Sequence, residues 1–120
     1  MGTWTVTREI DQPIRHRCFT SSGGDYLADL TLRLSPDLDL IGVEFCNILT
    51  EPPAVDYAAD VELGIREFAN RRAKDLRPIG YLRVTLLEMP ISLVDAKPHR
   101  FKEAALMAMT AAFEAAEIEI

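Results

Sequence analysis

Apolar and polar residues alternate through much of the N-terminal half of the chain, and this period of two predicts β-strands. The clearest case is residues 26–35, where the even positions from Tyr26 to Leu34 are all apolar and most odd positions are polar. A strand with this pattern buries one face and leaves the other in solvent. Gly23 and Gly24, just before it, predict a hairpin turn.

Weaker alternation predicts further strands elsewhere in the chain. These cover residues 3–9, 14–20, 43–49 and 79–89. In the third of them, Val43, Phe45 and Leu49 are expected to face the core. Cys46 belongs to the same strand, which is expected to be buried.

Two later segments change to helical spacing. Residues 55–74 carry apolar side chains three and four positions apart, with Asp56 in an early turn and Arg71 and Lys74 in the last, an arrangement that suits the helix dipole. Residues 100–116, just after Pro98, form an alanine-rich and almost wholly apolar pattern. This composition predicts a second helix that packs closely against both the sheet and the first helix.

The order of strands, helix, strand and helix predicts an α+β fold, a two-layer α/β sandwich with both helices on one face of a mixed sheet. The other face is expected to be exposed and rich in threonine and charge. Its members are Thr5, Thr7, Thr31, Arg33, Arg83 and Thr85.

Length and composition support a single domain over residues 1–120, since 48% of the residues are hydrophobic and 27% are charged. No stretch is long and apolar enough to span a bilayer, and the first residues do not follow the pattern of a signal peptide. We therefore expect a cytoplasmic protein with no membrane partner. The formal net charge of −6 argues against general binding of nucleic acid, although a local basic patch remains compatible with it.

The residues that could carry chemistry do not form a known catalytic or cofactor pattern. Ser92, Asp95 and His99 are the residue types of a hydrolytic triad, but no glycine-flanked nucleophile turn accompanies them. Gly23-Gly24 lacks the lysine and the strand-to-helix context of a phosphate-binding loop. With two histidines and two cysteines in the chain and no ligand spacing around them, we expect no enzyme activity, no nucleotide, no cofactor and no metal.

A basic cluster at the start of the second helix is a stronger candidate. Lys97, His99, Arg100 and Lys102 gather where free helix amides already favour phosphate. Arg15 and Arg17 are expected to approach the neighbouring tip loop. The cluster is interpreted either as an RNA contact or as an ordinary solvated surface. No aromatic platform for stacking bases lies beside it.

Several ordered segments resemble one known domain. "GGDYLADLTLRLSP", "GVEFCNIL", "VELGIRE", "GYLRVTL", the pair Val94-Asp95 and "FKEAALMA" are similar to the fourth domain of elongation factor G and related translational GTPases. That domain has the fold of the second domain of ribosomal protein S5. The resemblance spans nearly the whole chain, whereas the GTPase domain of the family has no counterpart in it.

The resemblance implies a site made of two loops at one tip of the domain, which in the family reaches tRNA and messenger RNA in the ribosome. The implied RNA- or ribosome-binding residues are Ser22, Gly23, Gly24, Asp25, Ser92, Asp95, Lys97, His99, Arg100 and Lys102. The glycine-rich loop is shorter than in the family, and Ser92 stands where the family has a histidine. A serine hydroxyl does not provide the titratable ring of histidine.

Two hypotheses follow from the sequence. In the first, the chain is a non-enzymatic, translation-factor-like module that binds the ribosome or structured RNA through these loops. In the second, it is a protein-interaction or self-associating domain that uses the exposed sheet face and has no role with RNA.

Overall fold

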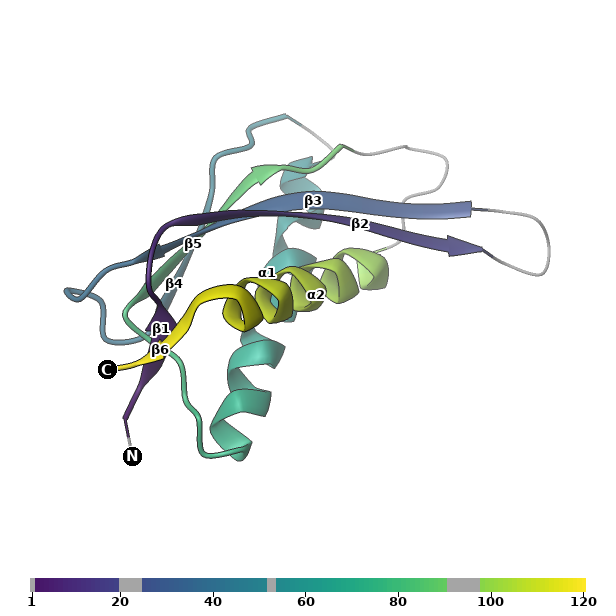
Figure 1. Ribbon diagram of the computed structural model, residues 1–120. Coiled ribbons are helices and arrows are strands. Elements are labelled where there is room, and N and C mark those ends of the chain that lie inside the picture. The colour runs from purple at the N-terminus through teal and green to yellow at the C-terminus, as the bar shows by residue number, and fades with distance from the viewer. Residues whose placement is uncertain (1, 20–24, 52–53, 91–97) are drawn as a thin grey trace.

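The computed structural model of the protein describes residues 2–19, 25–51, 54–90 and 98–120 (Figure 1). Over these residues the elements follow in the order β1 (Trp4–Val6), β2 (Ile10–Phe19), β3 (Asp25–Pro36), β4 (Val43–Asn47), α1 (Ala54–Lys74), β5 (Leu82–Glu88), α2 (Pro98–Ala116) and β6 (Glu117–Glu119).

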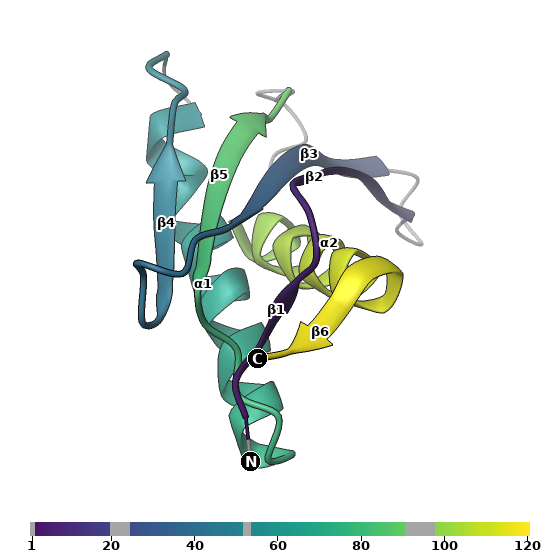
Figure 2. The same ribbon diagram turned by 60° about the vertical axis from the view of Figure 1, so that its left-hand side comes forward.

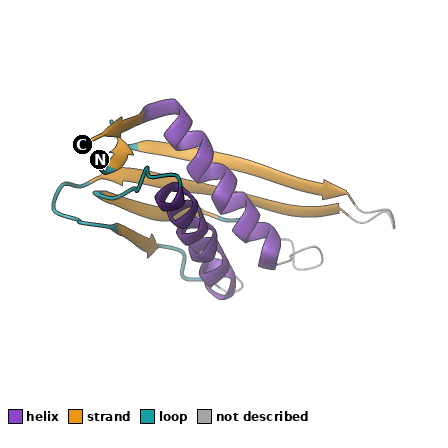
Figure 3. Cartoon of the chain, turned by 90° about the horizontal axis from the view of Figure 1, so that it is seen from below, coloured by secondary structure: helices purple, strands orange, loops and turns teal. Residues whose placement is uncertain are grey.

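The main sheet has the strand order β2-β3-β5-β4. β2, β3 and β5 pair antiparallel, whereas β4 runs parallel to β5 and forms one edge of the sheet (Figure 2). Both helices lie across the same face of this sheet (Figure 3). The predicted α+β two-layer sandwich with a mixed sheet is therefore confirmed.

Alternation along β3 determines which side chains enter the core. Leu30, Leu32 and Leu34 are almost completely buried beneath the helices, and Thr31 and Arg33 between them point to the open face and are half-buried. Because side chains alternate along a strand, the register of β3 with its neighbours places the whole apolar row on the helix side. The clearest pattern in the sequence thus lies at the centre of the fold.

The two helices approach each other closely at Gly64 of α1. A Cβ built on this glycine would overlap the carbonyl oxygen of Lys102 and would lie 2.8 Å from the Cβ of Ala105, both in α2. The buried face of α1 continues through Val61, Ile65 and Phe68. A helical glycine costs stability relative to alanine, and here the space it leaves lets the α2 backbone approach.

The N- and C-terminal segments form a second, two-stranded sheet that was not predicted. β1 pairs antiparallel with β6, with Trp4 opposite Glu119 and Val6 opposite Glu117. Figure 1 shows β1 and β6 next to each other. Because β1 belongs to this pair, the segment from Trp4 to Val6 does not extend the main sheet.

Two threonines were consequently misplaced by the sequence analysis. Thr5 is 1% exposed, and its hydroxyl donates a hydrogen bond to the carbonyl of Tyr81 at 3.2 Å. Thr7 is exposed but follows β1, and its N–H donates to the carbonyl of Ala116 at 2.8 Å. Neither residue contributes to the open face of the main sheet.

Several element boundaries also differ from those predicted. β2 begins at Ile10, and it accommodates Pro13 because an edge strand tolerates a residue without an N–H. β5 begins only at Leu82, since Tyr81 adopts a left-handed backbone conformation with φ of 52°. α2 begins at Pro98, at the first helical position that proline favours.

Cys46 in β4 is half-buried, which corrects the expectation of a buried thiol. Its Sγ lies 3.3 Å from Oε1 of Glu44, and desolvation together with this carboxylate raises the pKa of the thiol. The expected inward positions of Val43, Phe45 and Leu49 are confirmed, since all three pack against the core. No helix in the described part of the chain is both long and apolar enough to cross a membrane.

Candidate nucleic-acid interface

The predicted tip residues fall into two groups. Six of them lie outside the described residues: Ser22, Gly23, Gly24, Ser92, Asp95 and Lys97. Asp25 begins β3, where its backbone is paired with Phe19 of β2. His99, Arg100 and Lys102 lie in the first turns of α2. The site can therefore be built from the start of α2 and the strands beside it.

A charged cluster fixes the start of α2 to β2. Nε2 of His16 in β2 lies 2.6 Å from Oε2 of Glu103, and Nη1 of Arg100 lies 2.9 Å from the same oxygen. His16 reaches the helix because the even positions of β2 point toward it, as Ile14 does. Glu103 thus accepts bonds from the strand and from its own helix.

These contacts set the charge of Glu103. The hydrogen bond from His16 is the largest influence, and together with the bond and charge of Arg100 it outweighs desolvation and lowers the pKa of Glu103. Glu103 is consequently ionised at neutral pH, and its negative charge lies beside the guanidinium of Arg100. The charge of Arg100 is offset within the protein.

Lys102 also has a carboxylate beside it. Its Nζ lies 3.5 Å from Oε2 of Glu67 in α1, and Nη2 of Arg71 lies 3.0 Å from the other oxygen of that carboxylate. Desolvation alone would raise the pKa of Glu67, but the two cations outweigh it and the pKa is lowered. Two of the three described cations at the start of α2 therefore pair with acidic residues that the sequence analysis did not include.

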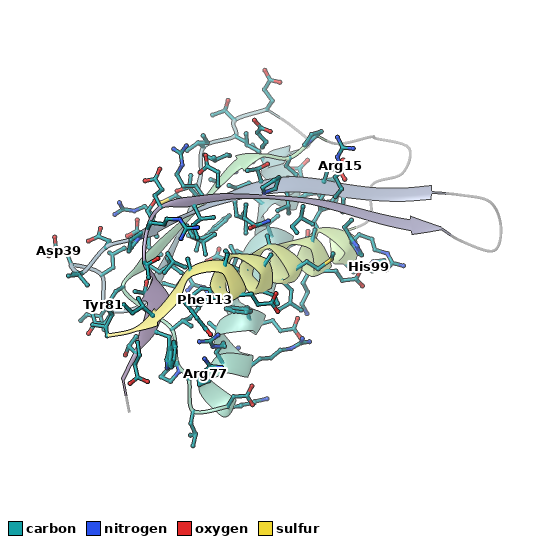
Figure 4. The ribbon with its side chains drawn as sticks, in the orientation of Figure 1. Arg15, Asp39, Arg77, Tyr81, His99 and Phe113 are labelled. Carbon is teal, nitrogen blue, oxygen red and sulfur yellow. The ribbon has the colours of Figure 1, made fainter. Side chains whose placement is uncertain are left out.

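His99 is exposed in the first turn of α2. Arg15 had been expected to approach the same tip. Instead, the register of β2 places Arg15 opposite Asp29 on the open face, and Figure 4 shows it on the other side of the sheet from His99. The sheet separates these two side chains, so the described cations do not form one continuous basic patch.

The acidic partners of Arg100, Lys102 and His16 differ in how easily the sequence predicts them. Glu103 is three positions after Arg100, a spacing that brings side chains together on a helix and is visible in the sequence. The contacts from His16 to Glu103 and from Lys102 to Glu67 join different elements and need the tertiary fold. Among the described residues, no group of three or more His, Cys, Asp or Glu side chains could hold a metal ion.

Comparison with known proteins identifies a solved structure with a similar fold. No protein-family model matches the sequence, and no curated protein matches it. Among solved structures, the chain is similar to the crystal structure of ttk003000868 from Thermus thermophilus, with a TM-score of 0.75 and 22% sequence identity over 97% of this chain. The chain spans 17% of the length of that protein. At this identity the likeness establishes a shared α+β architecture and nothing about activity.

Proposed function

We propose that this chain is a non-enzymatic, translation-factor-like module that binds the ribosome or structured RNA through the start of α2 and the two adjoining segments, residues 22–25 and 92–97. The proposal places the protein in the cytoplasm. It is supported by the resemblance to the fourth domain of elongation factor G, because the element order and the two-layer architecture are those that the resemblance implies.

The observation that carries the proposal is the position of the first turn of α2. This turn lies beside the arms of the β2–β3 hairpin, which extend past it in Figure 1, and His16 joins the two elements through Glu103. A helix start presents amide groups that attract phosphate. Since Arg100 and Lys102 pair with acidic side chains, His99 is the described basic side chain expected to contribute most to RNA binding. Lys97, which the sequence predicts for the same site, is expected to add to it.

Co-sedimentation with ribosomes over a series of salt concentrations tests this proposal. The wild-type protein should pellet at low salt, and its binding should fall steeply as salt rises, because phosphate contacts release counterions. His99→Glu and Lys97→Glu should each weaken binding about fivefold or more at low salt.

A matched control is Lys74→Glu, at the end of α1, where the lysine is exposed and has no ion pair with another described residue. It makes the same charge change as Lys97→Glu and should leave ribosome binding unchanged. If all three variants pellet like the wild-type protein, or if none of the wild-type protein pellets at low salt, the proposal is wrong.

The open face of the sheet supports a second candidate, self-association or binding of a protein partner. Nε of Arg33 lies 3.1 Å from Oε1 of Glu9 and 2.7 Å from Oδ1 of Asp11. The helices cover only the other face of the sheet (Figure 3). A polar and internally paired surface of this kind is compatible with a partner that covers it.

Sedimentation velocity tests this second candidate. A dimer formed through the face should dissociate in Thr85→Arg, because Thr85 lies between Arg33 and Cys46 across the paired strands. Thr110→Arg, on the exposed side of α2, makes the same change on the opposite layer and should not alter the mass. A wild-type monomer at high concentration that captures no partner would exclude this candidate.

A further inference from the structure

A surface hollow of about 460 Å³ lies where β4 and β5 end, outside the residues proposed to contact RNA. Residues 48–51, which follow β4, form one side, and residues 87–90, at the end of β5, form the other. Figure 2 shows the two parallel strands side by side with β4 at the sheet edge. Their carboxyl ends therefore open at the same margin of the sheet, a common position for ligands in sheets with parallel strands.

The hollow exists because the two strands stop pairing there. The register ends at Asn47 opposite Leu86, and the last bond, from the N–H of Ile48 to the carbonyl of Leu86, is already 3.5 Å long. The N–H of Leu49 donates a hydrogen bond to the side-chain oxygen of Asn47 at 2.9 Å, and not to β5. The chain after β4 therefore leaves the sheet instead of extending it.

Apolar side chains provide most of the lining. Met89 is 6% exposed, whereas Ile48 is 58% exposed at the side of the hollow. Val55, 47% exposed, lies close by in the first turn of α1, where its N–H donates a hydrogen bond to the carbonyl of Glu51 at 3.3 Å. A large apolar side chain that remains this exposed loses little by contacting a partner and gains from being buried.

Two carboxylates give the hollow its charge. Glu51 and Glu88 both line it, and both are exposed. Neither forms an ion pair with another described residue, in contrast to Glu44, which lies 3.0 Å from Arg83 on the neighbouring part of the sheet. The hollow therefore combines apolar contact area with negative charge that no ion pair within the described part of the chain compensates.

We propose that this hollow binds a segment of another protein in which an apolar side chain lies between lysine or arginine residues. The apolar side chain would enter beside Ile48 and Met89, and the basic side chains would lie against Glu51 and Glu88. Charge complementarity determines this choice of partner, because the same carboxylates repel the phosphates of RNA and of anionic lipid. The hollow thus provides a second binding surface, which prefers basic side chains, whereas the start of α2 is proposed to bind phosphate.

Fluorescence anisotropy with a short, fluorescein-labelled peptide, in which one leucine lies between lysines, tests the proposal. The peptide should bind saturably, with a Kd between about 10 μM and about 100 μM at low salt. Replacing the leucine by serine, or the lysines by glutamates, should each weaken binding about tenfold. A single-stranded RNA oligonucleotide of similar length should not displace the peptide.

Paired variants locate the binding. Ile48→Ser should weaken binding about tenfold, whereas Ile41→Ser, at an isoleucine that is 89% exposed near the other end of β4, should not change it. Glu88→Lys should weaken binding about fivefold, and Glu114→Lys, at an exposed glutamate of α2, should have a much smaller effect. All four side chains are exposed, so thermal melts of the variants should stay close to the wild type.

Three results would overturn the proposal. One is the absence of saturable binding up to about 1 mM peptide. Another is equal binding of the leucine and serine peptides, which would show that charge alone attracts the probe. The third is equal weakening by Glu88→Lys and Glu114→Lys, which would show that the peptide responds to net charge and not to this hollow.

Discussion

Arg72 is an unusually enclosed cation that joins three parts of the fold. Its guanidinium lies 5.6 Å from the ring centre of Trp4 and 5.1 Å from that of Phe113, and its Nη1 lies 2.8 Å from Oε2 of Glu117. These partners belong to β1, α2 and β6, whereas Arg72 belongs to α1. Aromatic faces attract a cation most strongly where water is excluded, so the side chain stabilises the contact between the helix and the terminal strands.

Glu117 completes this cluster and makes its stability depend on pH. Desolvation would raise the pKa of Glu117, but the hydrogen bonds and charges of Arg72 and Arg77 outweigh it, and the pKa is lowered. A carboxyl group whose pKa is lower in the folded state stabilises the fold above its unfolded pKa. That stabilisation is lost as the pH falls through the folded value.

We expect Glu117→Gln to lower the free energy of unfolding by about 1.5 kcal/mol at pH 7, because the half-buried guanidinium of Arg72 loses its counter-charge. As the pH falls from about 7 to about 3, the wild-type carboxyl moves toward its lowered pKa, so the difference in stability between the two proteins should shrink. Urea unfolding at both pH values, followed by the fluorescence of Trp4, measures the difference. An equal difference at pH 7 and pH 3 would show that the ion pair does not contribute.

At the scale of elements, the crossing of the two helices depends on the missing side chain of Gly64. A methyl group there would meet the backbone of α2 at Lys102, and a carbonyl cannot move aside as the end of a flexible side chain can. Gly64→Ala gains helix propensity, but we expect the clash to dominate and to destabilise the protein by about 2 kcal/mol. Chemical denaturation gives this value directly.

Asn70→Ala provides the comparison on the same helix. Asn70 is exposed, so alanine there should be neutral or slightly stabilising through propensity alone. If Gly64→Ala changes the free energy of unfolding as little as Asn70→Ala does, a methyl group at position 64 does not clash with the α2 backbone.

The same scale shows which elements a sequence can reveal. The strand around residues 26–35 and the helix near 55–74 were predicted because their periodic patterns are local and long. β6 was missed because Glu117–Glu119 is three residues long and directly follows a helix. It forms only because β1, at the opposite end of the sequence, lies beside it. Thr5 was misplaced for the same reason, since its burial depends on that pairing.

The charges of the candidate site were predictable from the sequence, but only one of the two acidic partners was. The cations near the start of α2 are visible in the sequence. Glu103 offsets the charge of Arg100 from three positions later in α2, whereas the contact of Lys102 with Glu67 depends on how α1 and α2 cross. The hollow beside Glu51 and Glu88 has no sequence pattern, because it arises where two strands diverge.

At the scale of the whole molecule, acidic side chains without an ion-pair partner outnumber basic ones among the described residues. Among the described residues, the carboxylates without an ion-pair partner are those of Asp29, Asp39, Glu51, Asp56, Asp60, Asp75, Glu88, Glu114 and Glu119, whereas the corresponding arginines and lysines are Arg8, Arg15 and Lys74. Most of the ion pairs that do form are between partly exposed side chains, and such pairs contribute little. Repulsion among the excess carboxylates should therefore be the larger long-range effect.

This imbalance predicts that salt stabilises the fold while it weakens binding to RNA. Raising NaCl from about 20 mM to about 300 mM shortens the screening length and should raise Tm by about 3 °C, or roughly 0.5 kcal/mol. The double variant Glu114→Lys with Asp75→Lys reduces the formal charge from −6 to about −2 and should lose most of this increase. Calorimetric melts of both proteins at each salt concentration measure this change in Tm. If salt lowers Tm of the wild-type protein, the exposed ion pairs outweigh the repulsion, and arginine pairs such as Arg33 with Asp11 contribute more than their exposure suggests.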